Sequence, residues 1–228
     1  MHPTAVAGTS IMGMDQQDSE DRRPRRSPAP GERKRDAERT RERILEAALV
    51  EFSEHGYAGA RISAIARRAG ANQQLISYYF DGKAGLYQAL ADRWRAISGG
   101  ISRPDASLAD IVEGFLRANV ERRAWARLLA WEGLTGDTGT DETTDAFFTA
   151  MVEDAERRQQ AGEIAADLDP AAVLLVFFAA ASAPTLLPQV VRRISGQDPD
   201  SPEFLARYGD QLRRMLDKLA APVHTPRR

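Results

Sequence analysis

The spacing of apolar residues constrains this 228-residue chain more than any other feature of its sequence. From Glu38 onward, apolar side chains recur every three or four positions, first at Ile44, Leu45, Ala48 and Phe52. A period near 3.6 residues gathers such side chains on one face of a helix. No stretch alternates apolar and polar residues as a half-buried strand does, and no hairpin turn or internal repeat is visible. The pattern therefore predicts an all-α fold.

Glycine, asparagine and proline residues divide this pattern into separate helices. Residues that end or cap a helix interrupt the N-terminal part at Gly56, Gly70, Asn72 and Asp81-Gly82. They leave a long first helix, two short ones over 62–69 and 73–80, and a fourth that reaches Trp94. We expect Gly99-Gly100 and Pro104 to form a hinge. The helices predicted beyond the hinge cover 107–119, 122–134, 145–161, 170–183 and 201–220, with a loop over 137–144.

One uncharged stretch, Pro170–Val191, is long enough to raise the question of a membrane span. Pro184 and Pro188 interrupt it. The helix that remains, about 171–183, is too short to cross a bilayer core of about 30 Å at 1.5 Å per residue. We therefore expect a helix that is buried on all sides, and no membrane contact.

Charge is unevenly distributed, although the net charge is only −2. Arg22–Arg95 carries sixteen basic and nine acidic residues, whereas Ala96–Arg228 carries fifteen basic and twenty acidic ones. This asymmetry favours an anionic partner for the first block alone. The chain has no cysteine, and His2, His55 and His224 are far apart in sequence. We therefore expect no metal, no cofactor and no catalytic site, and a cytoplasmic location.

Composition divides the chain into four parts. Residues 1–36 are rich in Pro, Gly, Ser and charge, so we expect a disordered arm, acidic at first and then basic. Residues 37–95 and 96–222 are expected to fold as two helical domains, and 223–228 to form a disordered tail. The basic end of the arm, RRPRRSPAPGERKR, leaves two interpretations open. It is either a solvated tail or an arm that touches DNA phosphates or the minor groove.

The segment GANQQLISYYFDGKAGLY, from Gly70 to Tyr87, combines amides, hydroxyls and aromatic rings. On a helix over 73–80, the apolar face carries Ile76, Tyr79 and Phe80. The opposite face is polar, with Leu75 on its flank, and it carries Gln73, Gln74, Ser77 and Tyr78. Glutamine pairs well with adenine, and serine with several base edges. A helix, a glycine turn and a second short helix with a polar outer face match the helix-turn-helix plan. A merely soluble surface helix is the alternative.

Thr40–Leu90 resembles the DNA-binding domain of TetR-family transcriptional regulators. The matching residues follow the family spacing, and they are Ile44-Leu45, Ala47-Ala48, Phe52, Gly56-Tyr57, Ile62, Ile65-Ala66, Ala69-Gly70, Phe80, Lys83 and Leu86. The resemblance implies a three-helix helix-turn-helix domain followed by a larger helical ligand-binding and dimerisation domain. It also implies a homodimer whose recognition helices enter successive major grooves of a near-palindromic, double-stranded DNA operator. Ligand binding would shift the DNA-binding heads and release the DNA.

The resemblance also implies which residues contact DNA. Base contacts fall to Gln73, Gln74, Leu75 and Ser77. Backbone or phosphate contacts are expected at Thr40, where helix one opens, and at Arg61, Asn72, Tyr78, Tyr79 and Lys83. The chain departs from the family at Ser77, where tyrosine is common, at Tyr79, where histidine is common, and at Arg61, where serine or threonine often caps the second helix. These departures leave the operator sequence open.

The C-terminal half resembles the family only in kind. By order along the chain, the 170–183 and 201–220 helices correspond to the dimer interface, although a buried core helix is the alternative for the first of them. Candidate ligand contacts are Phe115, Asn119, Trp125, Trp131, Phe147, Phe148 and Phe178. Glu132 is a further orienting group, but aromatic residues at helical spacing also serve as core. A small effector would be mostly apolar or aromatic.

Three functions remain open at this point, and a helical surface adaptor with no DNA role is a fourth option that the basic block Arg22–Arg95 disfavours. The first is a repressor released from DNA by a small ligand. The second is a DNA-binding regulator without a small ligand, controlled by abundance or by a protein partner. The third is an all-helical enzyme, which the absence of a nucleophile–base pair, a metal-ligand cluster and a phosphate loop disfavours.

Overall fold

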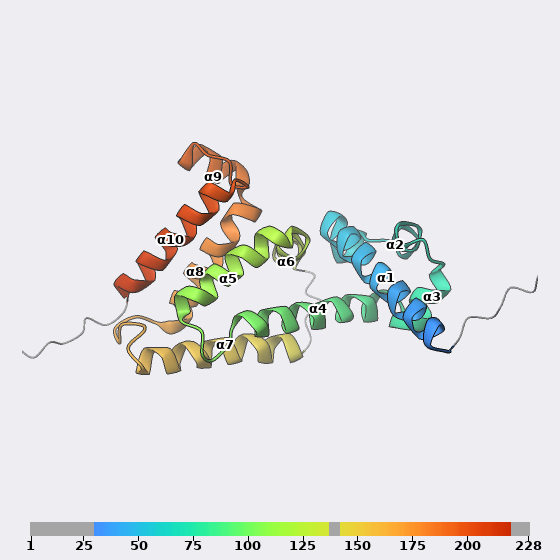
Figure 1. The fold of residues 1–228 in the computed structure, drawn as a ribbon, viewed down its shortest axis with the longest axis horizontal. Coiled ribbons are helices and arrows are strands. Elements are labelled where there is room, and N and C mark those ends of the chain that lie inside the picture. Colours follow the sequence, from blue (N-terminus) through green and yellow to red (C-terminus); the bar gives the residue numbers. More distant parts are fainter. Residues whose placement is uncertain (1–29, 137–141, 220–228) are drawn as a thin grey trace, which may run out of the picture. The chain divides into compact units, whose positions relative to one another are not determined.

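The computed structural model describes residues 30–136 and 142–219, and these ranges contain ten helices and no strand (Figure 1). The all-α prediction is therefore confirmed. The helices are, in chain order, α1 (Pro30–Gly59), α2 (Ile62–Ala69), α3 (Gln73–Phe80), α4 (Gly82–Ile101), α5 (Leu108–Glu121), α6 (Arg123–Thr135), α7 (Glu142–Gln160), α8 (Pro170–Leu186), α9 (Pro188–Ser195) and α10 (Pro202–Leu219). The chain divides into Met1–Ala37 and Glu38–Arg228, and the packing described below lies within the second unit.

Helices α1 to α4 build the N-terminal helix-turn-helix domain around one apolar core. The core takes side chains from all four helices, and Phe52, Ile65, Ile76 and Leu86 are among those with no more than traces of exposed surface. α1 is kinked at Gly56, whose φ of 67° lies in the left-handed region that favours glycine. The predicted end of the first helix is thus a kink, after which helical turns continue to Gly59.

The C-terminal domain is organised around α5, which packs against both α8 and α10. Its larger core cluster joins side chains from four helices and from the segment between α7 and α8, and they are Leu108, Val112, Ala155, Ile164, Val173, Phe177, Leu212 and Leu216. A second cluster next to it includes Ile111, Phe115 and Leu116 of α5, with Trp94 and Ile101 of α4 packed against it. The helix that leaves the DNA-binding domain therefore also contributes to the C-terminal core.

Helix α8 continues past a proline that we expected to end it. It runs to Leu186 with Pro184 inside, so the predicted end near Ala183 is wrong. A proline in a helix leaves the carbonyl four residues earlier without its N–H donor. That carbonyl belongs to Ala180, and the hydroxyl of Tyr208 on α10 donates a hydrogen bond to it at 2.9 Å. A partner from another helix thus replaces the missing donor.

Two further boundaries differ from the predicted ones. α1 begins at Pro30, so the described part of the expected disordered arm is helical, and Thr40 lies inside α1 rather than at its start. Strong helix formers, mainly Glu and Arg, extend the helix toward the N-terminus. α4 runs through Gly99-Gly100, where we expected a hinge. Ile101 packs closely against Gly114 of α5, where a Cβ atom would lie 2.7 Å from Ile101 Cγ2. The residue after the two glycines is thus packed against α5.

Some predictions concern residues that the structure does not describe. The rest of the 1–36 arm and the 223–228 tail lie outside the described ranges. The predicted loop over 137–144 is described only from Glu142, where α7 begins.

No single helix within the described ranges is both long enough and apolar enough to cross a bilayer. α8 and α9 reach the required length and composition only when they are counted together, and they are bent by 94° at the break between them.

Candidate nucleic-acid interface

Helix α3 presents to solvent the side chains that the sequence placed on its outer face. The exposed residues of α3 are Gln73, Gln74, Ser77 and Tyr78. The side facing the core carries Ile76 and Phe80, which are buried, and Leu75 and Tyr79, which are half-buried. The predicted orientation of this helix is therefore confirmed. Its outer face offers two amides, a hydroxyl and a phenol that is 80% exposed, which are groups that can bind base edges and phosphates.

α3 begins at the predicted cap and ends at Asp81-Gly82 as predicted, and a glycine that sequence reasoning missed allows α4 to follow closely. Asn72 Oδ1 accepts a hydrogen bond from the Leu75 N–H at 2.8 Å, as an N-cap does. At the other end, a Cβ atom on Gly85 would lie 1.8 Å from the carbonyl oxygen of Phe80. Only glycine allows the first turn of α4 to approach α3 so closely. The repeated glycine in DGKAGLY was the available signal.

Arg61 precedes α2 at the position where the TetR family often has a capping serine or threonine. Its own side chain makes no cap and is exposed. Instead, the buried carboxylate of Glu51 on α1 accepts the Arg61 N–H at 3.2 Å. A neighbouring helix thus bonds the Arg61 N–H at the start of α2, and the guanidinium group is left at the surface.

Lys83, another candidate phosphate contact, has partners within the domain. Its Nζ donates to the carbonyl of Ala58 at 3.2 Å and lies 4.8 Å from the ring centroid of Tyr57. These contacts join the start of α4 to the turn after the α1 kink. Lys83 therefore has a structural role beside any contact with DNA.

Helix α6 follows the DNA-binding domain in sequence but packs into its core. Trp125 and Leu128 are buried members of that core, and the Trp125 ring stacks on Trp94 of α4 with 5.5 Å between ring centroids. We expected Trp125 to be a ligand contact, and the structure places it here instead. Its helical spacing predicted a buried face but not which domain that face contacts.

The next turn of α6 makes polar contacts with the same domain. The Trp131 indole N–H donates to the Ser53 carbonyl at 3.1 Å, and its ring lies 3.4 Å from the position of a Cβ atom on Gly56. The carboxylate of Glu132 accepts a hydrogen bond from the Tyr87 hydroxyl. Burial raises the pKa of Glu132 from 4.5 to about 7. Trp131 is thus also a contact between domains, and it is not among the residues that line the cavity described next.

A small apolar cavity lies among α5, α7 and α8. Its lining includes Phe115 on α5, Met151 on α7 and Phe178 on α8. Its volume is about 30 Å³, whereas an engineered protein cavity that holds benzene has roughly 150 Å³. In this conformation the cavity therefore holds a few water-sized groups at most, and an effector would have to enlarge it.

The remaining ligand candidates lie elsewhere. Asn119 is buried, and its amide donates to the Ala181 carbonyl at 3.3 Å and to Ser182 Oγ at 3.1 Å, so it joins α5 to α8. Phe147 and Phe148 contact each other on α7, with Phe148 44% exposed. Of the seven candidates, the structure brings only Phe115 and Phe178 together at the described cavity.

One grouping of possible metal ligands differs from our expectation of none. Ligand atoms of Glu51, Glu54 and His55 on α1 lie within 4.8 Å of one another. Both carboxylates already have partners, because Glu51 accepts the Arg61 N–H and Glu54 pairs with Arg68 at 3.0 Å. The one-turn spacing of the three residues along α1 was the signal in the sequence.

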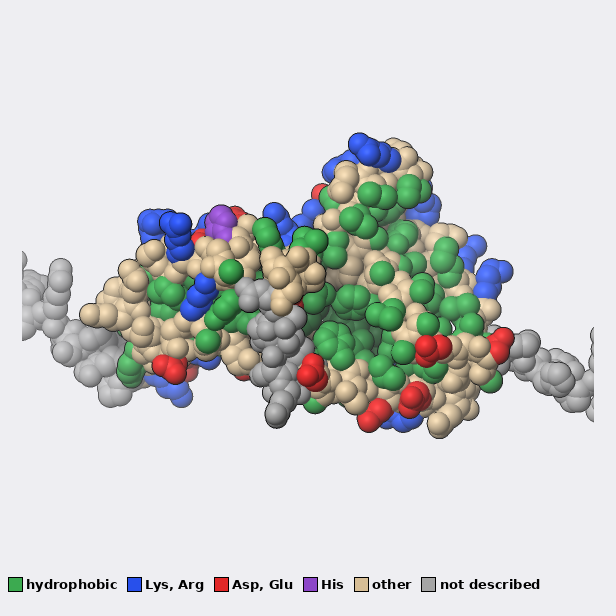
Figure 2. Space-filling view, turned by 180° about the vertical axis from the view of Figure 1, so that it is seen from behind, with side chains coloured by type: hydrophobic (Ala, Val, Ile, Leu, Met, Phe, Trp, Pro, Cys, Tyr) green, Lys and Arg blue, Asp and Glu red, His purple; other side chains and the backbone are tan. Residues whose placement is uncertain are grey.

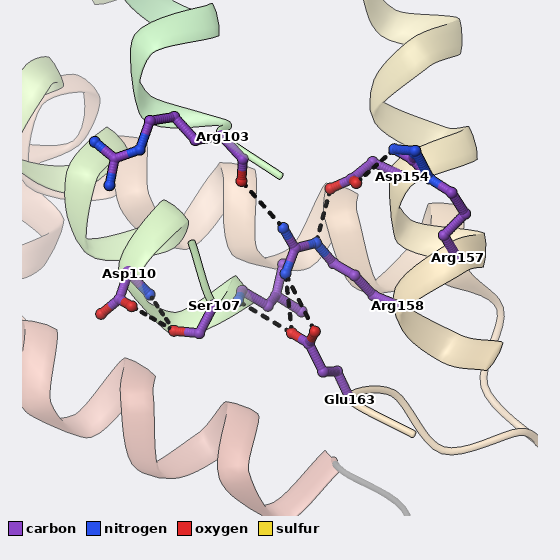
Figure 3. Close-up of polar contacts among 8 residues, drawn as sticks. Arg103, Ser107, Asp110, Asp154, Arg157, Arg158 and Glu163 are labelled. Atoms are coloured by element: carbon purple, nitrogen blue, oxygen red, sulfur yellow. Dashed lines mark hydrogen bonds and ion pairs between the residues drawn. The ribbon is translucent and has the colours of Figure 1, made fainter. Parts of the chain in front are cut away.

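A buried arginine joins three segments at the far end of α4 (Figure 3). Arg158 on α7 donates to Asp154 at 2.7 Å, to Glu163 at 3.0 Å and to the Arg103 carbonyl at 3.5 Å. Glu163 also accepts the Leu108 N–H at the start of α5. Neighbouring carboxylates and hydrogen bonds raise the pKa of Arg158 against the opposing effect of burial. The cluster fixes the turn between α4 and α5 onto α7.

Apolar side chains gather on one face of the C-terminal domain, as Figure 2 shows. The exposed large apolar residues of α8 and α9, with the residue between them, are Leu175, Val176, Leu187, Val190 and Ile194. Leu175 and Val176 are 69% and 62% exposed. The expectation that α8 is buried on all sides is therefore wrong, and exposed apolar side chains of this kind are typical of a protein–protein contact.

The packed helices, the exposed polar face of α3 and its tight turn to α2 define a helix-turn-helix DNA-binding protein. Comparison with known families agrees with this class. Residues 44–90 match the family described as bacterial regulatory proteins, tetR family, and residues 107–214 match the tetracyclin repressor-like C-terminal domain. The chain belongs to the TetR family of transcriptional regulators.

Individual relatives support the assignment. The HTH-type transcriptional repressor SCO4008 of Streptomyces coelicolor is 30% identical over 192 residues, which cover 81% of this chain and 98% of that protein. The repressor NicS of Pseudomonas putida is 30% identical over 112 residues, or 46% of this chain and 53% of NicS. The crystal structure of the putative regulator SCO4942 from Streptomyces coelicolor aligns with a TM-score of 0.64 at 25% identity, over 77% of this chain and 97% of that one.

The class of function follows from this membership. The chain is a DNA-binding transcriptional repressor of the TetR family. Regulators of this family bind DNA operators, act as dimers and are not enzymes.

Proposed function

We propose that this protein is a homodimeric repressor that leaves a near-palindromic operator when a small, mostly apolar effector binds its C-terminal domain. The observation that carries the proposal is the exposed polar face of α3, held on a core that α6 of the C-terminal domain also enters. One element thus belongs to both the DNA-binding and the effector-binding half. We further propose that the protein works in the cytoplasm, where its DNA is found.

The proposed base contacts are the exposed Gln73, Gln74 and Ser77, with the half-buried Leu75 beside them. Glutamine reads adenine through two hydrogen bonds, and leucine suits a thymine methyl group. The groups proposed to bind the phosphate backbone are Thr40, Arg61, Asn72, Tyr78, Tyr79 and Lys83. The exposed guanidinium of Arg61 and phenol of Tyr78 support this assignment most directly.

The proposed dimer forms through α8 and α10. The exposed Leu175 and Val176 on α8 and the 54% exposed Met215 on α10 support it, because a monomer would leave these apolar side chains in water. The small residues of α8, such as Ala172 and Ala179, are also exposed and would let two helices approach closely.

The proposed effector site is the cavity that Phe115 and Phe178 line. Since its volume is about 30 Å³, effector binding must separate α5, α7 and α8. The effector releases DNA only if it binds this opened conformation better than the DNA-bound one. α4 and α6 pack on both domains, and their movement would change the position of α3.

Fluorescence anisotropy with labelled DNA tests the DNA-binding role. The protein is titrated onto the region upstream of its own gene and onto a scrambled duplex, at two salt concentrations. We expect binding at least about 10³-fold tighter to the upstream region. Equal and strongly salt-dependent binding to both duplexes would indicate an electrostatic binder only. Absence of binding to either at low salt would refute the assignment of α3.

Two variants separate base contacts from phosphate contacts. Gln74→Ala should weaken specific binding by about 1–3 kcal/mol and relax the preference at one base position. Lys83→Ala should weaken binding to all sequences alike and lower the salt slope by about one. Because Lys83 also contacts Ala58, the melting temperature of this variant is measured alongside. A Gln74→Ala variant that binds both duplexes as the parent does would show that α3 is oriented differently.

A regulator without a small effector is the second candidate, and the small size of the cavity favours it. A thermal-shift screen against apolar metabolites and antibiotics distinguishes the two. A ligand that binds the folded state raises the melting temperature by mass action. Stabilisation by a compound that also releases the DNA supports the effector-responsive repressor, whereas no shift across a broad panel supports control by abundance or a protein partner.

A further inference from the structure

Two serine hydroxyl groups, one in the last turn of α4 and one on the residue that follows this helix, have no hydrogen-bond partner among the described residues. They are Ser98 Oγ and Ser102 Oγ, and both atoms are buried. Ser98 as a whole has 0% exposed surface. The two residues are four positions apart, so their side chains lie on the same face of the helix. Since an unpaired buried hydroxyl destabilises a protein, two neighbouring ones point to a polar partner that the described residues do not supply.

This face of α4 packs against the wall of the cavity. Trp94 and Ile101 lie one turn before and about one turn after Ser98, and both pack against the cluster that contains Ile111 and Phe115. Ile111 and Phe115 also line the cavity. The two hydroxyls therefore lie behind the side chains that separate the cavity from α4.

Met151 can open the way between the cavity and α4. It lines the cavity and also packs against the cluster that Ile101 contacts. Methionine is unbranched and has three rotatable side-chain bonds, so it changes shape at little cost. A movement of Met151 and Phe115 would join the cavity to the face that carries Ser98 and Ser102. The enlarged site would be apolar with a few polar groups on one wall, as ligand sites usually are.

We propose that Ser98 and Ser102 bind the polar end of the effector when the cavity opens toward α4. This proposal rests on the proposed effector-responsive function and specifies the chemistry of its ligand. The ligand has an apolar ring or chain that fills the space among α5, α7 and α8. It carries a neutral hydrogen-bonding group, such as a hydroxyl, a ketone or an ester, that the two serines hold.

The charges around the site explain why the group is neutral. A hydroxyl both donates and accepts hydrogen bonds, so two serines suit a neutral partner of either kind. The buried guanidinium nearby is that of Arg158, which donates to the Arg103 carbonyl next to Ser102. Its charge is already paired with Asp154 at 2.7 Å and Glu163 at 3.0 Å. A ligand carboxylate would be buried there without a counterion, which is costly.

Matched probes in two sizes test this proposal on the full-length protein. The larger set is 2-naphthol, naphthalene and 2-naphthoate, and the smaller set is phenol, benzene and benzoate. Each compound is titrated while the melting temperature is followed, which gives an apparent affinity for the folded state. We expect at least one hydroxyl compound to bind about three- to tenfold more tightly than its hydrocarbon, and its carboxylate to bind most weakly.

Ser98→Ala and Ser102→Ala then locate the hydroxyl contact. Ser98→Ala should remove most of the preference for the hydroxyl compound and leave the hydrocarbon affinity within about twofold. It should leave the melting temperature of the free protein unchanged or raise it, because the parent hydroxyl is unpaired. Ser53→Ala is the control, since Ser53 is buried like Ser98 but its hydroxyl donates to the Val50 carbonyl at 2.8 Å. It should lower the melting temperature and keep the preference.

Several results would overturn the proposal. They are an equal affinity for the hydroxyl compounds and their hydrocarbons, tighter binding of the carboxylates, and no shift with any of the six probes. A Ser98→Ala variant that melts lower and still prefers 2-naphthol would show that the hydroxyl is structural. Operator binding is measured for the same proteins. If the parent binds its operator but fails these tests, only this inference falls, whereas failure to bind DNA would refute the proposed function itself.

Discussion

Glu132 provides a test of the contact between α6 and the DNA-binding domain. Its carboxylate accepts a hydrogen bond from the hydroxyl of Tyr87, which belongs to the helix-turn-helix core. Burial raises the pKa of Glu132 from 4.5 to about 7. The perturbation is Glu132→Gln, which keeps the size of the side chain and an oxygen that accepts from Tyr87 but removes the titratable group.

The direction in which stability changes with pH follows from the linkage between protonation and folding. Between pH 4.5 and about 7 the folded state keeps a proton on Glu132 that the unfolded state has released. The contribution of Glu132 to the free energy of unfolding is therefore fully present below pH 4.5 and is lost as the pH rises to about 7. The difference between the two pKa values corresponds to about 3 kcal/mol. Because Glu132 is only partly buried, solvent screening reduces this free-energy difference. We expect the protonation of Glu132 to contribute about 1–2 kcal/mol to stability.

Urea unfolding at pH 5 and pH 7.5 measures the effect, at one fixed protein concentration because the protein is proposed to dimerise. At pH 5 we expect parent and Glu132→Gln to have similar stability. At pH 7.5 the variant should be more stable by about 1–2 kcal/mol. Glu153→Gln, which removes an exposed carboxylate from α7, controls for the change in net charge. If the free energy of unfolding changes between pH 5 and pH 7.5 by the same amount in the parent and in Glu132→Gln, the reasoning is refuted.

Three other variants test local contacts by urea unfolding. Asn72→Ala should cost about 1 kcal/mol by removing the cap of α3, and an unchanged midpoint would show that the cap contributes nothing. Tyr208→Phe should cost about 1 kcal/mol, because the Ala180 carbonyl before Pro184 loses its donor; a neutral result would mean that water replaces the hydroxyl. Arg158→Met should cost about 3 kcal/mol by leaving two carboxylates uncompensated, and a more stable variant would contradict this.

The DNA-binding helix could be predicted from the sequence because its determinants are local. Asn72 caps the helix three residues away, and Asp81-Gly82 ends it. The alternation of apolar and polar residues at helical spacing then decides which side faces the core, and Ile76 is buried where the pattern placed it. Each of these inferences uses only residues that are close to one another in the sequence.

The role of α6 could not be predicted in this way. Helical spacing predicts that Trp125 and Leu128 face a core, but a period does not identify which one. Both lie in the core of the DNA-binding domain, and Trp125 stacks on Trp94 of α4, which lies 31 residues earlier in the chain. Of the aromatic residues assigned to a ligand site, Trp125 therefore lies in the core of the DNA-binding domain, whereas Phe115 lies in that of the C-terminal domain. The partners of a buried face depend on the tertiary fold, which local sequence does not encode.

The continuation of α8 through Pro184 shows how a tertiary contact overrides a local rule. The proline removes one N–H donor, so the Ala180 carbonyl loses its hydrogen bond within the helix. Tyr208 supplies the missing donor only because α10 lies against α8 at this level. The proline thus leaves an acceptor that one position on α10 can satisfy, which favours one register between these helices. Since α8 and α10 are the helices proposed to form the dimer interface, the same hydrogen bond would fix the surface that each subunit presents to the other.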